Sequence, residues 1–143
     1  MKTEILIMPW KDAREFEPLT DTYAIRILGQ LQRRVNEPLK KSERYSDIRE
    51  YFFDDVSQGS SHTQTFTSEN AKQILEDFRK RKKSSSLLVH CLLGQSRSPA
   101  VAIALNEVFQ VGNDSKELKK KYPLFNRHVY DTMMQEAERF AIN

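Results

Sequence analysis

The chain has 143 residues, of which 38% are hydrophobic and 30% are charged, and its formal net charge is +3. A chain of this length can bury the core of one domain, so residues 1–143 are expected to form a single domain. The composition excludes a disordered chain, the apolar runs are too short to span a membrane, and the mild positive charge does not by itself indicate a nucleic-acid partner.

The chain carries one cysteine, Cys91, so it cannot form an internal disulfide. The apolar run near the first residue is too short for a secretory signal peptide, and none is expected. A thiol used in chemistry needs a reducing environment, so the expected location is the cytoplasm. Neither a metal nor a cofactor is expected, and no membrane partner is expected.

Runs of apolar and alternating residues predict four strands, at residues 4–8, 22–28, 48–53 and 86–90. Residues 29–46 are polar and charged, and we expect them to form a surface connection with one helical turn. Residues 57–65 are rich in serine, glycine and threonine and are expected to form a loop.

Apolar residues at helical spacing predict helices in the second half of the chain. One opens at residues 67–70, two more span residues 99–109 and 125–140, and a short capped segment spans residues 115–121. Strands separated by helices, without an internal repeat, predict an α/β fold with a central, mostly parallel sheet flanked by helices. Ligands bind at the carboxyl edge of such sheets.

The segment from His90 to Ser98 joins a predicted strand to a predicted helix. Ser98 and Pro99 are residue types that begin a helix, with the serine as its cap. A strand, a loop with a central glycine and a helix N-terminus form an anion site, because backbone N–H groups and the helix dipole point into it. Cys91 lies at the base of this loop, and the guanidinium of Arg97 further favours its thiolate. The segment therefore predicts an anion-binding loop with a nucleophile.

These nine residues match the pattern H-C-x-x-G-x-x-R-S/T. The chain thereby resembles the cysteine-based protein tyrosine phosphatases, and among them the dual-specificity enzymes and the small bacterial and phage enzymes. The resemblance implies a phosphate loop, residues 91–97, placed between a strand and a helix. It also implies that Cys91 attacks phosphorus to form a cysteinyl-phosphate, and that Arg97 holds two phosphate oxygens through its planar fork.

The resemblance gives roles to the other positions as well. Gly94 would let the backbone approach the phosphate without a side-chain clash. Ser98 would hydrogen-bond the thiolate and help it to leave. His90 would fix the loop by hydrogen bonding, and the alternative is an ordinary histidine at a strand end. The phosphate would be bound by the loop residues Leu92, Leu93, Gly94, Gln95, Ser96 and Arg97.

Phosphoryl transfer to a thiolate also needs an acid that protonates the leaving oxygen. In the related enzymes this acid is an aspartate on a separate loop that follows a strand. Asp54 and Asp55 lie at that place, within residues 53–56, which we call the acid loop. Asp55 is the residue that we choose, and Asp54 is the alternative. An Asp-Asp pair also suits a turn that ends a strand, and His62 is a weaker candidate further along.

Asn126 precedes the last predicted helix. The segment resembles one that in dual-specificity phosphatases supplies an asparagine that braces the phosphate loop. In this chain two residues separate Pro123 from Asn126, whereas the family places proline and asparagine side by side. The alternative is that Asn126 simply caps the helix.

The expected function is hydrolysis of phosphotyrosine, with phosphoserine and phosphothreonine as further substrates, in a phosphorylated protein or peptide. An alternative enzyme would act on inositol phosphates, phosphoinositides or RNA 5′ ends. Such relatives often carry lysine or arginine in the loop, whereas residues 92–96 have no positive charge. A further alternative is a non-catalytic phosphate-binding module, although Cys91, Arg97 and a candidate acid are all present.

Overall fold

The computed structural model describes residues 2–30, 37–56, 59–60 and 63–139. The strands are β1 (Glu4–Pro9), β2 (Thr22–Leu28), β3 (Tyr45–Phe52) and β4 (Ser86–Cys91). The helices are α1 (Trp10–Ala13), α3 (Ser68–Arg79), α4 (Arg97–Phe109), α5 (Ser115–Lys121) and α6 (Arg127–Arg139). Within these described ranges no helix is both long enough and apolar enough to cross a membrane.

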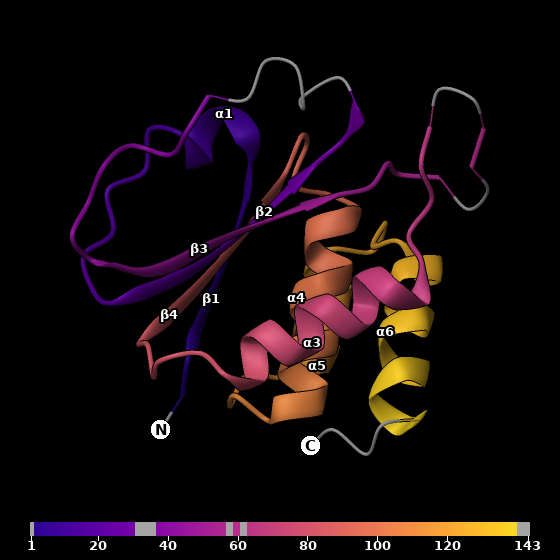
Figure 1. The fold of residues 1–143 in the computed structure, drawn as a ribbon. Coiled ribbons are helices and arrows are strands. Elements are labelled where there is room, and N and C mark those ends of the chain that lie inside the picture. Colours follow the sequence, from indigo (N-terminus) through magenta and orange to yellow (C-terminus); the bar gives the residue numbers. More distant parts are fainter. Residues whose placement is uncertain (1, 31–36, 57–58, 61–62, 140–143) are drawn as a thin grey trace.

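The four strands form one sheet in the order β1-β4-β2-β3, and every neighbouring pair is parallel (Figure 1). The predicted α/β fold with a mostly parallel sheet is therefore confirmed, and this sheet is parallel throughout. Because the strands run in the same direction, their carboxyl ends meet at one edge of the sheet. The loops that follow β3 and β4 both leave from that edge.

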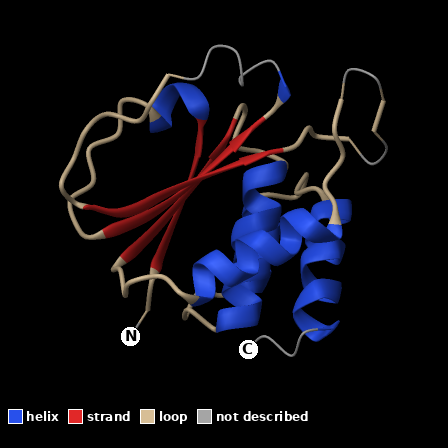
Figure 2. Ribbon diagram, in the orientation of Figure 1, coloured by secondary structure: helices blue, strands red, loops and turns tan. Residues whose placement is uncertain are grey.

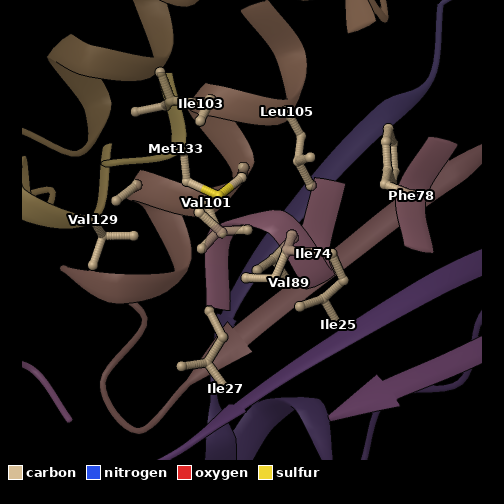
Figure 3. Packing of buried hydrophobic residues seen from close by; sticks show 14 of the residues in the cluster. Ile25, Ile27, Ile74, Phe78, Val89, Val101, Ile103, Leu105, Val129 and Met133 are labelled. Carbon is tan, nitrogen blue, oxygen red and sulfur yellow. The ribbon is translucent and has the colours of Figure 1, made fainter. Parts of the chain in front are cut away.

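The two central strands, β2 and β4, are buried at every position. A strand of this kind needs cover on both faces of the sheet. The helices α3, α4 and α6 gather on one face (Figure 2), where Ile25 and Val89 meet Val101 and Met133 (Figure 3). On the other face a smaller cluster packs beneath α1 and consists of Ala13, Ala24, Leu39 and Leu88, with Leu6, Met8, Phe16 and Tyr45 at its border.

Local chemistry explains how the helices begin. At the start of α3, the Thr67 hydroxyl accepts from the Asn70 backbone N–H, and the Asn70 side chain accepts from the Thr67 N–H, which completes a capping box. Asp114 caps α5 by accepting backbone N–H bonds from Lys116 and Glu117. In contrast to these amphipathic or exposed helices, α4 is buried along most of its length and packs against β1, β4, α5 and α6.

Several boundaries differ from those predicted. β3 begins at Tyr45, inside the expected surface connection, because the start of β2 supplies a parallel partner for it. α4 begins two residues earlier than expected, at Arg97, and α6 begins two residues later, at Arg127. Phe125, expected in that last helix, instead packs into the core just ahead of it. The four-residue helix α1 was not predicted, since it is too short to show a period.

Candidate active site

The phosphate loop leaves the sheet at the end of β4 and enters α4 directly. Cys91 is the last residue of the strand and Arg97 is the first residue of the helix. Both side chains are buried, Cys91 to within 1% of full burial, while Leu93 at the loop surface is 70% exposed. The loop therefore has a buried thiol where it leaves the sheet and a buried arginine where it enters the helix.

The thiol of Cys91 lies among groups that can donate to it. The Ser98 hydroxyl is 3.1 Å from its Sγ atom, and the Gly94 backbone N–H donates to the same sulfur at 3.3 Å. Gly94 precedes α4 and Ser98 lies in its first turn, and the N-terminus of a helix carries partial positive charge. The sulfur therefore lies at the N-terminal end of α4, within hydrogen-bond distance of two polar groups.

Ser98 does not cap α4, so that part of the expectation is wrong. The cap position belongs to Ser96, whose side chain makes no capping hydrogen bond, and Ser98 is the second residue of the helix. The Ser98 hydroxyl instead faces Cys91, which is the contact that the resemblance implied. The helix thus begins one residue before Ser98, and the Ser98 hydroxyl lies against the sulfur of Cys91.

Gly94 is held at the tightest point of the loop. Its φ is +71°, and a Cβ added there would stand 2.7 Å from the Pro9 nitrogen and 2.8 Å from the Met8 carbonyl carbon. Glycine is thus needed both for the left-handed backbone and for the close approach to β1. The loop is tied to the same place by the Trp10 N–H, which donates to the Leu92 carbonyl at 3.1 Å.

Arg97 joins the phosphate loop to the acid loop. Its NH1 group donates to the Phe53 carbonyl at 2.9 Å, inside the protein. Phe53 is itself buried and stacks edge-on against Phe66, with ring centroids 4.6 Å apart. The guanidinium is therefore oriented from one side by a fixed backbone carbonyl.

The two aspartates of the acid loop have different surroundings. Asp55 Oδ1 accepts the Ser96 hydroxyl at 2.7 Å and the Asn126 side-chain amide at 2.6 Å. Asp54 uses both of its carboxylate oxygens on backbone N–H groups, those of Gln30 at 3.1 Å and Gln64 at 2.7 Å. Asp55 thus contacts the phosphate loop, while Asp54 ties the acid loop to neighbouring segments. His62, the weaker candidate for the acid, lies outside the described residues.

Asn126 contacts both the last helix and the phosphate loop. Its Oδ1 atom accepts from the Val129 N–H at 3.0 Å and so caps α6. Its backbone N–H donates to the Ser96 carbonyl at 3.0 Å, and its side-chain amide reaches Asp55. The spacing from Pro123 does not prevent the asparagine from contacting the phosphate loop.

His90 is fully buried, and its side-chain partner belongs to the sheet. Its Nε2 atom accepts from the Nε–H of Arg26, 3.0 Å away on β2. Burial, reinforced by the charge of Arg26, lowers the pKa of His90 to about 4. Arg26 is not among the predicted site residues. The available signal was one charged residue inside the otherwise apolar run Thr22–Leu28.

In the phosphate loop, a cysteine at the end of a parallel strand is followed six positions later by an arginine at the start of a helix. A strand, a loop and a helix N-terminus in this order form a site whose backbone N–H groups can bind an anion. The chain accordingly has the fold of the cysteine-based, dual-specificity-like tyrosine phosphatases.

Comparison with solved structures gives the same fold. The structure of Tk-PTP in the active form matches with a TM-score of 0.50 over 97% of this chain and 93% of that chain, at 19% identity. A human tyrosine phosphatase-like serine/threonine/tyrosine-interacting protein matches with a TM-score of 0.50 over 85% of this chain and 80% of that chain, at 14% identity. No family model matches the chain, and the search of curated proteins gave no match.

Proposed function

We propose that this protein is a phosphoric monoester hydrolase that dephosphorylates phosphotyrosine, and also phosphoserine and phosphothreonine, in a protein or peptide. One observation carries the proposal. The acid-loop side chain that accepts a hydrogen bond from the phosphate loop is a carboxylic acid, that of Asp55, and the donor is Ser96, one residue before Arg97. This contact supports the proposal, because it adds a candidate proton donor to the candidate nucleophile Cys91 and the candidate oxyanion-binding residue Arg97.

In the first step of the proposed reaction, the Cys91 thiolate attacks phosphorus. The S–P bond forms as the P–O bond to the substrate oxygen breaks, and Asp55 gives its proton to that oxygen. Arg97 holds the equatorial oxygens, with the N–H groups of the loop. Because Oδ1 of Asp55 already accepts two hydrogen bonds, the proton to be transferred resides on Oδ2.

In the second step, water attacks the cysteinyl-phosphate. Asp55, now ionised, takes a proton from the water while the S–P bond breaks and inorganic phosphate forms. The electron pair returns to the Cys91 sulfur, where the Ser98 hydroxyl is already within hydrogen-bond distance. A donor at this place stabilises the departing thiolate, which is the role proposed for Ser98.

The surface of the phosphate loop supports a substrate with a single phosphate. Leu92, Leu93 and Gln95 are exposed, and none of them carries charge. Ligands with several phosphates, such as inositol phosphates, phosphoinositides or RNA 5′ ends, are held by several cations. An apolar rim instead suits the ring of a phosphorylated tyrosine, so these other ligands are the second choice.

A non-catalytic module that binds phosphorylated proteins is the other candidate, and one observation favours considering it. One of the proteins that shares this fold is described as phosphatase-like. Fold alone therefore does not separate catalysis from binding. The presence of Cys91 with a candidate acid favours catalysis.

A substrate panel tests the proposal. Phosphotyrosine and phosphoserine peptides, an inositol phosphate and an RNA 5′-triphosphate would be assayed with the wild-type protein and with Cys91→Ser. We expect turnover of the phosphotyrosine peptide, and a loss of at least about 10⁴-fold in Cys91→Ser, with phosphate binding retained. Equal turnover by both proteins would exclude the covalent mechanism. Binding without turnover in the wild type would favour the module.

A further inference from the structure

A buried arginine lies behind the phosphate loop, on the face of the sheet opposite the thiol. Side chains alternate along a strand, so Arg26 shares its face with Ala24, while Cys91 belongs to the core on the helix side. Arg26 pairs in register with His90 of β4 on one side and with Glu50 of β3 on the other. It is 1% exposed.

The planar fork of Arg26 contacts three different acceptors. Its Nε–H donates to His90 Nε2 at 3.0 Å, NH1 donates to Glu50 Oε2 at 2.8 Å, and NH2 donates to the Glu37 carbonyl at 2.6 Å. An arginine with three fixed acceptors cannot rotate without losing hydrogen bonds inside the protein. The sheet therefore fixes the position of Arg26, and the hydrogen bond from its Nε–H holds the ring of His90.

This contact dictates the chemical state of His90. Arginine has no acceptor and does not lose its proton, so the ring nitrogen that faces it must be the unprotonated one. The imidazole is consequently neutral, with its single proton on Nδ1. The nearby backbone of Cys91 raises the pKa of His90, but by less than burial and Arg26 lower it. Among the described residues, no hydrogen-bond partner lies within normal distance and angle of Nδ1.

A gain in folding stability does not by itself explain why a charged arginine is buried beside His90. Taking a charge out of water is costly, and replacing a buried ion pair with apolar side chains of similar volume often leaves a protein at least as stable. Among the described residues, Arg97 from α4 also acts on His90, and Glu50 and Tyr45 from β3 lie next to Arg26. The hydrogen bonds of Arg26 thus include one to His90, the residue that immediately precedes Cys91.

We propose that Arg26 is a positioning residue of the phosphate loop, which fixes the tautomer and orientation of His90 and through them the geometry and reactivity of Cys91. The catalytic consequence rests on the function proposed above. If the ring were free to turn or to change tautomer, the backbone at the junction of β4 and the loop would lose its fixed support. The Gly94 N–H that donates to the sulfur would then be held less well.

The test compares Arg26→Met, which removes the donor and the charge at similar length, with Arg49→Met as a matched control. Arg49 lies on the neighbouring strand, but its side chain is about half exposed and pairs with Asp47 at the surface. Nitrogen NMR reports the tautomer of His90. Alkylation by iodoacetate between pH 5 and 8 reports the reactivity of Cys91 without ambiguity, because the chain has no other cysteine.

In Arg26→Met we expect both tautomers of His90, alkylation slowed about tenfold at pH 6, and kcat on an aryl phosphate lowered about 10- to 100-fold with little change in KM. Arg49→Met should match the wild type in each measurement. A folded Arg26→Met protein with the single wild-type tautomer and the wild-type alkylation profile would overturn the proposal.

A second variant keeps the test decisive if Arg26→Met does not fold. Arg26→Lys retains the charge, but an ammonium lacks the planar fork that holds the three acceptors together, so a smaller change in the same direction is expected. Wild-type values in folded Arg26→Lys would then overturn the proposal. A wild-type protein without turnover on any phosphate ester contradicts the proposed function instead, and the tautomer and alkylation data still decide the role of Arg26.

Discussion

The side-chain amide of Asn126 donates to Oδ1 of Asp55 at 2.6 Å, across 71 positions of the chain. Ser96 donates to the same oxygen, and the Asn126 backbone N–H donates to the Ser96 carbonyl. The start of the last helix, the acid loop and the phosphate loop are thereby joined in a closed set of hydrogen bonds. The orientation of the candidate acid depends on a residue that is remote from it in sequence.

Two substitutions separate the roles of Asn126. Asn126→Asp keeps an acceptor for the Val129 N–H but turns an oxygen instead of an N–H toward Asp55. We expect a melting temperature close to that of the wild type and a kcat lowered about tenfold, because the tether is lost. Asn126→Ala should lose the cap as well, and with it about 1 kcal/mol of unfolding free energy. Thermal unfolding and steady-state kinetics measure both, and full activity in Asn126→Asp would contradict the tether.

The leaving-group dependence of turnover distinguishes the two aspartates. Asp55→Ala should lower kcat about 10²- to 10⁴-fold for alkyl phosphates and far less for activated aryl phosphates, because only poor leaving groups need the proton. Asp54→Ala should destabilise the acid loop through two lost hydrogen bonds, while its rates keep the wild-type dependence on the leaving group. A series of aryl and alkyl phosphates gives this dependence. If Asp54→Ala is the variant that acquires a steep dependence, the assignment of the acid is wrong.

Gly94→Ala should damage the phosphate loop. The added methyl group would meet the backbone of β1, which cannot move aside, and the φ of +71° disfavours any residue with a Cβ. We expect a loss of about 2–4 kcal/mol in unfolding free energy, from strain and overpacking together. Gly59→Ala is the control, since its nearest neighbour would lie at 3.4 Å. Denaturant unfolding of both variants measures the difference, and equal stabilities would contradict this account.

His90 should make the protein less stable in mild acid. Its folded pKa is about 4, against about 6.5 in an unfolded chain, so between these values the unfolded state binds more protons. Stability from this residue is fully present above pH 6.5 and declines as the pH falls toward 4, by a total on the order of 3 kcal/mol. Urea unfolding from pH 4 to pH 7 measures the slope. His90→Gln keeps an acceptor for Arg26 but has no titrating ring, so its loss of unfolding free energy between pH 7 and pH 4 should be smaller by about 3 kcal/mol. An unchanged loss would refute the assignment.

The strands, the main helices and the phosphate loop were predictable because their signals are local. Nine consecutive residues from His90 to Ser98 contain the loop, and apolar periodicity marks the strand before it and the helix after it. The missed features have non-local causes. The Ser98 hydroxyl is recruited by the sulfur of Cys91 and not by the helix end, and β3 extends to Tyr45 because β2 supplies the partner that the sequence around Tyr45 does not reveal.

The sequence by itself determined that Cys91 and Arg97 lie at the two ends of one loop, because the apolar run before Cys91 predicts a strand and the apolar run after Arg97 predicts a helix. Only the tertiary structure decided which of two adjacent aspartates faces that loop, because Asp54 and Asp55 are distinguished by partners on other segments. The same holds for Arg26, which meets His90 across 64 positions through the register of two parallel strands. Contacts of this kind arise from how the sheet brings remote residues together, and no local pattern encodes them.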